Sequence, residues 1–262
     1  IFNTNMVNIY SKIQIFLRSR KVFKNWYIYP KIYFKLTKKE YAIFETKFGQ
    51  KIKIRVNSTD LMALTHVWLI EEYAKKNFDI KSSDTVIDVG AHIGLFTLYA
   101  SQSCKIGNIY SYEPVKENFE ILKENMNINN LKNVKIFNLA VSNSNSTITL
   151  FMNNDESGHS MFSESSENII VKSTSLMKIF DDNKIKECNF LKLDCEGAEY
   201  EIIEKLPSTY FEMIEKIIIE YHTVDSHPEL LEKLQNKLSA NNFKFETKML
   251  FSDIGFLYAT KN

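Results

Sequence analysis

An acidic residue closes an otherwise apolar segment in TVIDVGAHIGLFTLYA, residues 85–100, and a glycine-containing turn follows it. Asp88 ends the apolar run, and Gly90 and Gly94 lead into a helical pattern. Glycine has no Cβ and adopts positive φ freely, so a ligand can approach the backbone closely there. The spacing differs from the G-x-G-x-x-G loop of dinucleotide folds, and a carboxylate at the turn repels phosphate. The segment therefore favours a cationic ligand, and the sulfonium and ammonium of S-adenosylmethionine (SAM) meet this requirement.

A second acid ends the next apolar run, in IYSYEP. Glu113 stands roughly 20 residues past the glycine turn, where a carboxylate accepts both ribose hydroxyls of a nucleoside. An ordinary acid at a helix start, before Pro114, is the alternative interpretation of the same residue. After the third run, Asn138, Ala140 and Ser142 stand where an adenine ring would lie.

Further ionisable side chains follow the fourth and fifth runs. In FLKLDCEGAEYEII, Asp194 ends the run and Gly197 allows a tight turn into a helix that contains Glu199. KIIIEYH ends with Glu220 and His222. The carboxyl ends of parallel strands meet at one edge of the sheet, so these side chains should lie together. An unpaired buried charge is costly, so we expect them to bind a ligand or to form ion pairs with one another. A purely structural pair of an acid and His222 remains the alternative.

Strand and helix patterns alternate from residue 84 onward, which predicts a parallel sheet covered on both faces. The predicted strands are 85–89, 108–112, 134–140, 189–194, 215–221, 243–250 and 255–260, with helices at about 93–102, 115–129, 197–206 and 227–240. The last two strands have no helix between them, so we expect an antiparallel hairpin at the sheet edge. The segment 143–174 has a Ser/Asn-rich centre between two strand-like runs and predicts a mobile insert over the site.

The sequence also predicts an N-terminal extension, residues 1–80, before a catalytic domain at 81–262. Apolar residues in 9–26 have helical spacing, which predicts a helix. Residues 58–77 begin with Ser, Thr and Asp, which commonly cap helices, and predict a second helix. Alternating apolar residues in 31–37, 40–48 and 50–57 predict strands of a small antiparallel sheet.

Charge is distributed unevenly along the 262 residues, although the net charge is only +1. Residues 1–60 carry 13 Lys and Arg against 3 Asp and Glu, so this basic arm could meet an anionic glycan, a membrane surface or nucleic acid. A solvated face is the plainer interpretation. No run approaches the roughly 18–20 apolar residues of a membrane span, and no signal-peptide pattern stands at the start. Three cysteines without a CxxC pair suit a reducing compartment, so we expect a cytoplasmic protein.

Taken in order, VIDVGAHIGLFTLYAS, YSYEPVKENFEILKEN, FNLAVSN, FLKLDCEGAEYEIIE and IIIEYH resemble the FkbM-type SAM-dependent methyltransferases. The resemblance covers about residues 57–262. It implies an α/β class I methyltransferase (Rossmann-like) fold, with a seven-stranded sheet whose last strand is antiparallel. Characterised members of that family are O-methyltransferases that act on sugars, glycolipids and polyketides, so the resemblance implies a glycan, glycolipid or related small acceptor. His92 stands where the family usually has Asn, which predicts a changed or pH-dependent cofactor affinity.

Carried over residue by residue, the resemblance assigns site residues. The residues implied to hold SAM are Asp88, Gly90, Ala91, His92, Gly94, Glu113, Asn138, Ala140 and Ser142. Those implied to face methyl transfer are Asp194, Glu196, Glu220 and His222. We expect Asp194 or His222 to accept the hydroxyl proton, with Glu220 orienting His222. A magnesium-like ion on these three residues is the less favoured alternative, because His is a poor magnesium ligand.

Other features are weaker. The segment 153–165 is a candidate acceptor loop, and its His159 could act as a base, whereas His66 and His227 are expected to be structural. Two other functions compete with this one. A nucleic-acid methyltransferase is disfavoured because DCEG replaces the Asn/Asp-Pro-Pro-aromatic turn typical of base amino methylation. A SAM-binding protein without turnover would dock a partner through the basic arm. Membrane contact through that arm and a homo-oligomer also remain open.

Overall fold

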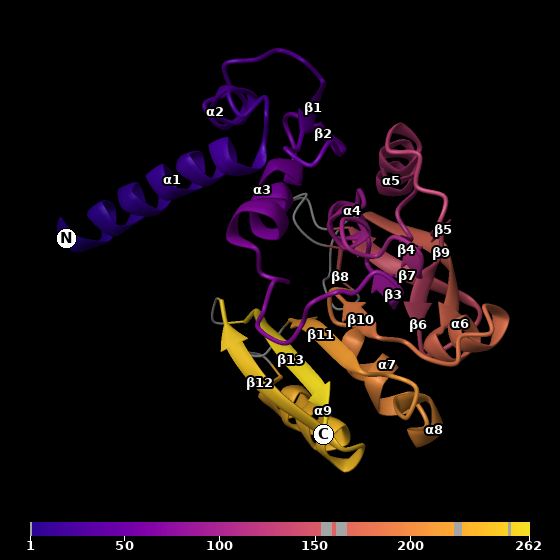
Figure 1. The fold of residues 1–262 in the computed structure, drawn as a ribbon. Helices are drawn as coiled ribbons and strands as arrows, with labels where there is room; N and C mark the ends of the chain where they lie inside the picture. Colours follow the sequence, from indigo (N-terminus) through magenta and orange to yellow (C-terminus); the bar gives the residue numbers. More distant parts are fainter. Residues whose placement is uncertain (1, 153–158, 161–166, 223–226, 251–252) are drawn as a thin grey trace.

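Seven strands form the central sheet, in the order β12-β13-β11-β10-β3-β4-β5 (Figure 1). The computed structural model describes the backbone of residues 2–152, 159–160, 167–222, 227–250 and 253–262, and the side chains of 12–150, 168–222, 227–250 and 253–262. The sheet strands are β3 (Thr85–Val89), β4 (Asn108–Tyr112), β5 (Val134–Phe137), β10 (Phe190–Leu193), β11 (Lys216–Tyr221), β12 (Phe243–Met249) and β13 (Gly255–Lys261). All seven predicted strands are therefore present.

Strand directions match the expected fold. The pairs β4–β5, β3–β4, β3–β10 and β10–β11 are parallel, and β13 is antiparallel to both β11 and β12. The predicted hairpin at the edge is confirmed, and β13 inserts between β11 and β12 so that β12 is the edge strand. This is the seven-stranded sheet with an antiparallel last strand that the sequence predicted.

Helices cover both faces because alternate strand residues point to opposite sides. Val86 packs into the layer that holds α4 (Leu95–Ser101) and α5 (Lys116–Ile128). Its neighbour Ile87 packs into the opposite layer. That second layer contains α6 (Leu176–Asp182), α7 (Glu199–Lys205), α8 (Ser208–Phe211) and α9 (Pro228–Ala240). The carboxyl ends of the strands remain available for a site.

The segment after β5 forms a second, smaller sheet in the order β6-β9-β7-β8. Its strands are β6 (Ala140–Ser142), β7 (Thr147–Met152), β8 (His159–Ser160) and β9 (Glu167–Ser175). The two strand-like runs predicted around the Ser/Asn-rich centre correspond to β7 and β9. The predicted acceptor loop at 153–165 lies almost entirely outside the described residues, so its role stays a prediction.

The N-terminal extension contains α1 (Phe2–Val22), α2 (Ile28–Tyr33), the hairpin of β1 (Tyr41–Glu45) and β2 (Lys51–Arg55), α3 (Asp60–Thr65) and the π-helical turn η1 (His66–Ile70). Figure 1 shows α1 reaching away from the sheet. The strand predicted at 31–37 is wrong, because α2 occupies its first residues. Pro30 stands in the first turn of α2, where its missing N–H costs nothing, and Tyr29 and Ile32 bury one helix face.

The helix predicted up to residue 77 is shorter, since Glu71 adopts a left-handed φ of 60° directly after η1. None of the described helices combines the length and apolarity that crossing a bilayer requires. The division of the chain at residue 80 stays a prediction.

Candidate functional site

Lys192 occupies the centre of the candidate site, at the carboxyl edge of the sheet. Its ammonium lies 3.2 Å from Asp88 Oδ1 and 3.3 Å from Asp194 Oδ2, and it donates to the carbonyl of Gly90 at 2.6 Å. Burial lowers the pKa of Lys192, but the charges of Asp88 and Asp194 outweigh it and raise that pKa above its usual value. The lysine therefore stays charged between two acids of neighbouring strands.

Asp88 is fully buried, and groups of its own chain surround it. Its Oδ2 accepts a hydrogen bond of 2.6 Å from the Thr97 hydroxyl, and Lys192 compensates its charge. The sequence suggested that this carboxylate meets a cationic ligand directly. In the structure the cation beside Asp88 is the Lys192 ammonium. A contact between Asp88 and the cofactor therefore stays a prediction.

The two glycines of the turn are required by the protein's own atoms. Gly90 has φ of 73°, and a Cβ there would lie 1.7 Å from the backbone oxygen of Asp194. Gly94 has φ of 87°, and its Cβ would lie 2.6 Å from Leu122 Cδ1. Close packing of β3 against β10 and α5 is thus one reason for these glycines, and close approach of a ligand to this backbone stays a prediction.

The amides of this turn also bond within the chain. Those of Gly90 and Ala91 donate to the carbonyl of Tyr112, and that of Gly94 donates to the carbonyl of Ala91. A pyrophosphate site needs such amides to point at the ligand. These three amides are therefore occupied within the chain, and the expected preference of the turn for a ligand without phosphate stays a prediction.

His92 is linked to the N-terminal extension. Its Nε2 lies 3.3 Å from an Arg55 guanidinium nitrogen, and since arginine only donates, Nε2 is the acceptor and the neutral ring carries its proton on Nδ1. Burial lowers the pKa of His92 to about 4. The ring is therefore neutral near pH 7, and titration of His92 changes the site only in acid.

Arg55 is held by a buried acid of the same extension. Its Nε and Nη2 donate to the two carboxylate oxygens of Asp60 at 3.0 and 2.7 Å, and Asp60 is fully buried. Nη2 also donates to Asn118 on α5 at 2.8 Å. A paired fork of this kind fixes the guanidinium and hence the orientation of His92.

Glu113 lies buried directly after β4. Its Oε2 accepts from the His92 amide at 2.7 Å, and its Oε1 accepts from the Val115 amide at 2.9 Å. Burial raises the pKa of Glu113 to about 7 although these hydrogen bonds lower it. Each carboxylate oxygen keeps acceptor capacity beyond these bonds, so the group suits a pair of ribose hydroxyls.

The predicted adenine-side residues separate in the structure. Asn138 braces the Glu113 turn, because its Nδ2 donates to the carbonyls of Glu113 and Pro114 at 2.9 Å each. Ala140 and Ser142 belong to β6 of the smaller sheet, where they pair with β9. Their contact with an adenine ring stays a prediction.

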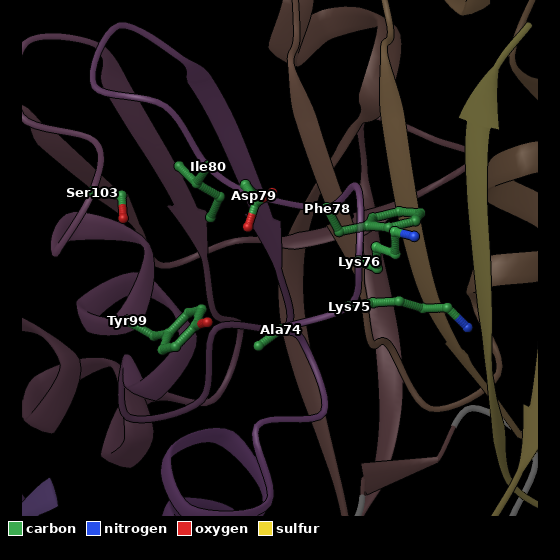
Figure 2. Close-up of a pocket in the computed structure, with 8 residues that line it drawn as sticks. All are labelled: Ala74, Lys75, Lys76, Phe78, Asp79, Ile80, Tyr99 and Ser103. Atoms are coloured by element: carbon green, nitrogen blue, oxygen red, sulfur yellow. The ribbon is translucent and has the colours of Figure 1, made fainter.

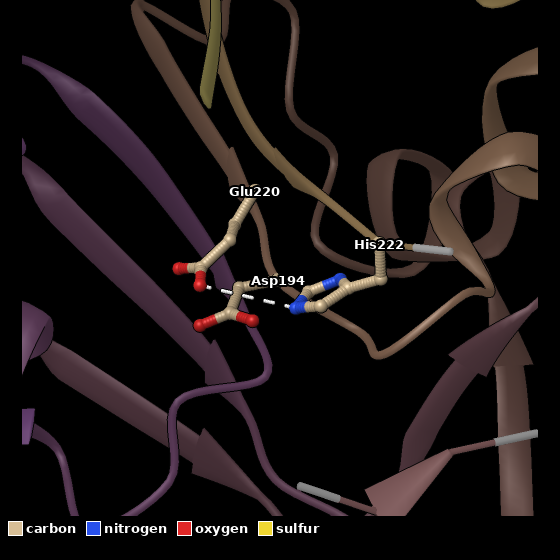
Figure 3. A group of neighbouring side chains, drawn as sticks. All are labelled: Asp194, Glu220 and His222. Carbon is tan, nitrogen blue, oxygen red and sulfur yellow. Dashed lines mark ion pairs between the residues drawn. The ribbon is translucent and has the colours of Figure 1, made fainter. Parts of the chain in front are cut away.

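Asp194, Glu220 and His222 converge at the ends of β10 and β11, as Figure 3 shows. One ligand atom from each lies within 4.8 Å of the others. His222 Nε2 is 3.8 Å from Glu220 Oε1, and His222 itself is 5% exposed. The structure thus brings the three predicted catalytic residues into one cluster.

Glu199, and not Glu220, orients the histidine. Glu199 is fully buried on α7, and its Oε1 accepts from the backbone N–H of His222 at 3.1 Å and lies 3.2 Å from Nδ1. Glu220 lies near the other ring nitrogen, Nε2, at 3.8 Å. The expectation that Glu220 orients the His222 ring is therefore corrected in favour of Glu199. Glu196, with Oε2 3.5 Å from Nε2, completes the acidic surroundings.

The charges of this cluster shift the pKa values of its members. Burial lowers the pKa of His222, but the Glu199 hydrogen bond and the charges of Glu199 and Glu196 raise it well above its usual value. Burial and the charge of Asp194 raise the pKa of Glu220 well above its usual value. Burial likewise raises the pKa of Glu196 to about 7. The cluster holds more acids than bases, which favours a cationic group at this rim.

Two residues of the site are not indicated by sequence spacing. Lys192 stands inside the buried run FLKLD, and a lone lysine within a buried strand is itself the signal that it is paired. Arg55 belongs to the extension, and only folding brings it to His92.

The remaining candidates lie outside this cluster. His66 pairs with Glu72 at 2.9 Å, and His227 stands at the start of α9, both consistent with structural roles. The side chain of His159 lies outside the described ones. A pocket of about 350 Å³ lies between residues 74–80 and α4, lined by Tyr99, Asp79 and Lys76 among others (Figure 2). It contains none of the predicted site residues.

The family of the chain follows from comparison with known proteins. The methyltransferase FkbM domain family matches residues 88–245, more than half of the chain. Methyltransferase 1 of Beauveria bassiana is 22% identical over 157 residues, which cover 52% of this chain and 63% of that protein, less than two thirds of its length. Methyltransferase sdnD of Sordaria araneosa is 22% identical over 193 residues, covering 61% of this chain and 74% of that protein.

The fold has a counterpart among solved structures. Methyltransferase FkbM from Methylobacillus flagellatus KT superposes with a TM-score of 0.51 at 16% identity, over 76% of this chain and 53% of that one. This likeness confirms the predicted class I methyltransferase fold. The chain belongs to the methyltransferase FkbM domain family.

Proposed function

We propose that this chain is a SAM-dependent O-methyltransferase that modifies a hydroxyl of a sugar, glycolipid or related small acceptor. The observation that carries the proposal is the convergence of Asp194, Glu220 and His222 at the sheet edge that also bears the glycine turn and Glu113. A carboxylate that can accept a proton, close to a carboxylate that can bind ribose hydroxyls, suits methyl transfer to a hydroxyl.

The residues present fit the proposed cofactor. Glu113 would hold the ribose hydroxyls through its remaining acceptor positions, and the acid-rich rim suits the positive end of the molecule. When bound, SAM supplies an electrophilic methyl group and leaves as S-adenosylhomocysteine. Hydrogen bonds from the amides of Gly90 and Ala91 to the carbonyl of Tyr112 tie the turn to β4, so this side of the site is fixed.

Asp194 is the better of the two proposed proton acceptors. Glu199 lies 3.2 Å from Nδ1 of His222, and the nearby acids raise the pKa of His222, which makes it the poorer proton acceptor. Asp194 is a partly exposed carboxylate, with 26% of its side chain accessible, and Lys192 holds it in place. The acceptor hydroxyl would give its proton to Asp194, while His222 and Glu199 fix the neighbouring charges.

A metal-assisted version uses the same residues. Asp194, Glu220 and His222 have the spacing to hold a divalent ion. One observation favours the metal-free version: Lys192 already lies 3.3 Å from Asp194 and compensates its charge.

The test is a transfer screen with radiolabelled SAM over cell-envelope glycans, glycolipids and RNA, with and without a chelator. Alkali-stable label on a glycan or glycolipid, unaffected by the chelator, supports the proposal. Label on RNA would show that the acceptor is a nucleic acid and not a glycan or glycolipid. Tight SAM binding without any transfer would contradict an enzymatic role. Loss of turnover with the chelator would support the metal-assisted version.

A further inference from the structure

The N-terminal extension exposes large apolar side chains that the rest of the molecule does not cover. Most of the exposed large apolar side chains in the described part of the chain belong to residues 13–48. We define the arm patch as five of them: Ile13, Leu17, Tyr33, Phe34 and Leu36, which are 47%, 52%, 39%, 57% and 73% exposed. Scattered apolar residues are ordinary on a surface, whereas a continuous group marks a contact site.

The arm patch is continuous because Phe16 joins its two halves. The Phe16 ring lies 5.5 Å from Tyr33 and 5.8 Å from Phe34, centroid to centroid. Ile13 and Leu17 stand one helical turn apart on α1, on the same side as Phe16. Leu36 follows in the turn that ends α2, where its amide bonds the carbonyl of Lys31.

The surroundings of the arm patch are strongly basic. Ten Lys and Arg stand between residues 12 and 48, against Glu40 and Glu45. One of these acids, Glu45, is paired with Lys24 at 2.6 Å. Lys31, Lys35, Lys38 and Lys39 lie within or next to the turn that carries Phe34 and Leu36, so positive charge borders the apolar group directly.

We propose that the arm patch docks on the surface of a membrane that contains anionic lipids. Basic residues around exposed aromatic and aliphatic side chains suit such a surface, because the cations meet lipid headgroups while the apolar groups enter the boundary with the acyl chains. Nucleic acid fits less well, since Ile13, Leu17 and Leu36 cannot stack on bases as aromatic rings do. A second copy fits less well too, because two equally charged arms repel each other.

The experiment is co-sedimentation of the full chain with vesicles of phosphatidylcholine, with or without phosphatidylglycerol, at low and high salt. The wild-type chain should bind only the anionic vesicles, and more weakly at high salt. Two variants, Phe34→Ser with Leu36→Ser, and Lys38→Gln with Lys39→Gln, should each lower the partition coefficient by about tenfold. Ile106→Ser, at a site 78% exposed outside the arm, is the matched control and should bind like the wild type.

Several results would overturn the proposal. These are the absence of binding to anionic vesicles at low salt, or equal binding by the wild type and the Phe34/Leu36 variant. RNA retention without vesicle binding would assign the arm to nucleic acid, and a dimer that this variant dissociates, again without vesicle binding, would assign it to a second copy. The assay needs neither SAM nor an acceptor, so its result is independent of the proposed function.

Discussion

Lys192 shows how charges organise the site at the scale of single residues. It lies between Asp88 on β3 and Asp194 after β10, and it also holds the carbonyl of Gly90. Removing one partner of such a buried pair leaves the other charge uncompensated, which costs more than the pair itself contributes. Lys192 therefore fixes the glycine turn and the proposed base relative to each other.

Replacement of the proposed base should separate binding from turnover. We expect Asp194→Asn to lower kcat by roughly 10²–10⁴ because the hydroxyl proton loses its acceptor, while SAM affinity changes by less than about threefold. Single-turnover kinetics and calorimetry measure the two quantities. Asp182→Asn, which removes only an exposed partner of Lys178, is the control. Full activity of Asp194→Asn would assign the base elsewhere.

Glu113 should make SAM binding depend on pH. Its pKa is about 7 in the free protein, and ribose hydroxyls donate to the ionised form. Binding should therefore tighten from about pH 6 to about pH 8, by up to about tenfold per unit below the pKa, and then level off. Calorimetry across this range checks the slope.

The control for this pH dependence is Glu113→Gln, which should bind SAM weakly and without the same slope. A wild-type dissociation constant that does not change over the range would show that Glu113 does not contact the cofactor.

At the scale of elements, the glycine turn joins β3 to β10 and α5 at distances that exclude a side chain. Gly90→Ala should destabilise the fold by about 3 kcal/mol or more, because its Cβ would meet the Asp194 carbonyl at 1.7 Å and φ is positive. Gly49→Ala is a matched control, since Gly49 also has positive φ, at 91°, but faces open space. We expect it to cost only about 1 kcal/mol in urea unfolding. Equal losses of unfolding free energy in Gly90→Ala and Gly49→Ala would show that the packing around Gly90 contributes nothing to stability.

Periodicity predicted the strands of the central sheet because those strands are short, apolar and separated by amphipathic helices. It failed at α2, where Ile32, Phe34 and Leu36 alternate like a strand, but Ile32 is buried together with Tyr29, three residues earlier, on one face of a helix. For the site, strand ends located Asp194, Glu220 and His222. Arg55 could not be found this way, since its contact joins β2 of the extension to His92, 37 positions later in the turn after β3.

At the scale of the whole molecule, the extension and the central sheet share one hydrogen-bonded framework. Asn125 on α5 bonds both the amide and the carbonyl of Lys53 on β2, at 2.7 and 3.0 Å. Arg55 continues this contact to His92 and Asn118. The extension is therefore part of the wall of the candidate site.

Cutting this framework should affect both stability and cofactor binding. Arg55→Met leaves Asp60 buried without its guanidinium, so we expect a loss of about 3 kcal/mol in the free energy of unfolding. SAM affinity should fall by about fivefold or more, because the His92 ring loses its donor. Lys24→Met, which breaks an exposed pair with Glu45, should leave both the free energy of unfolding and the SAM affinity close to the wild-type values. Unchanged SAM affinity in Arg55→Met would exclude the extension from the site.

The insertion of β13 between β11 and β12 has a consequence for synthesis on the ribosome. Until residues 255–261 have left the exit tunnel, β11 has one side without a neighbour and β12 has no place in the sheet. A nascent chain paused before that point presents an apolar open edge, the kind of surface that recruits other unfinished chains. Chaperone protection should therefore matter most until the β12–β13 hairpin has been synthesised.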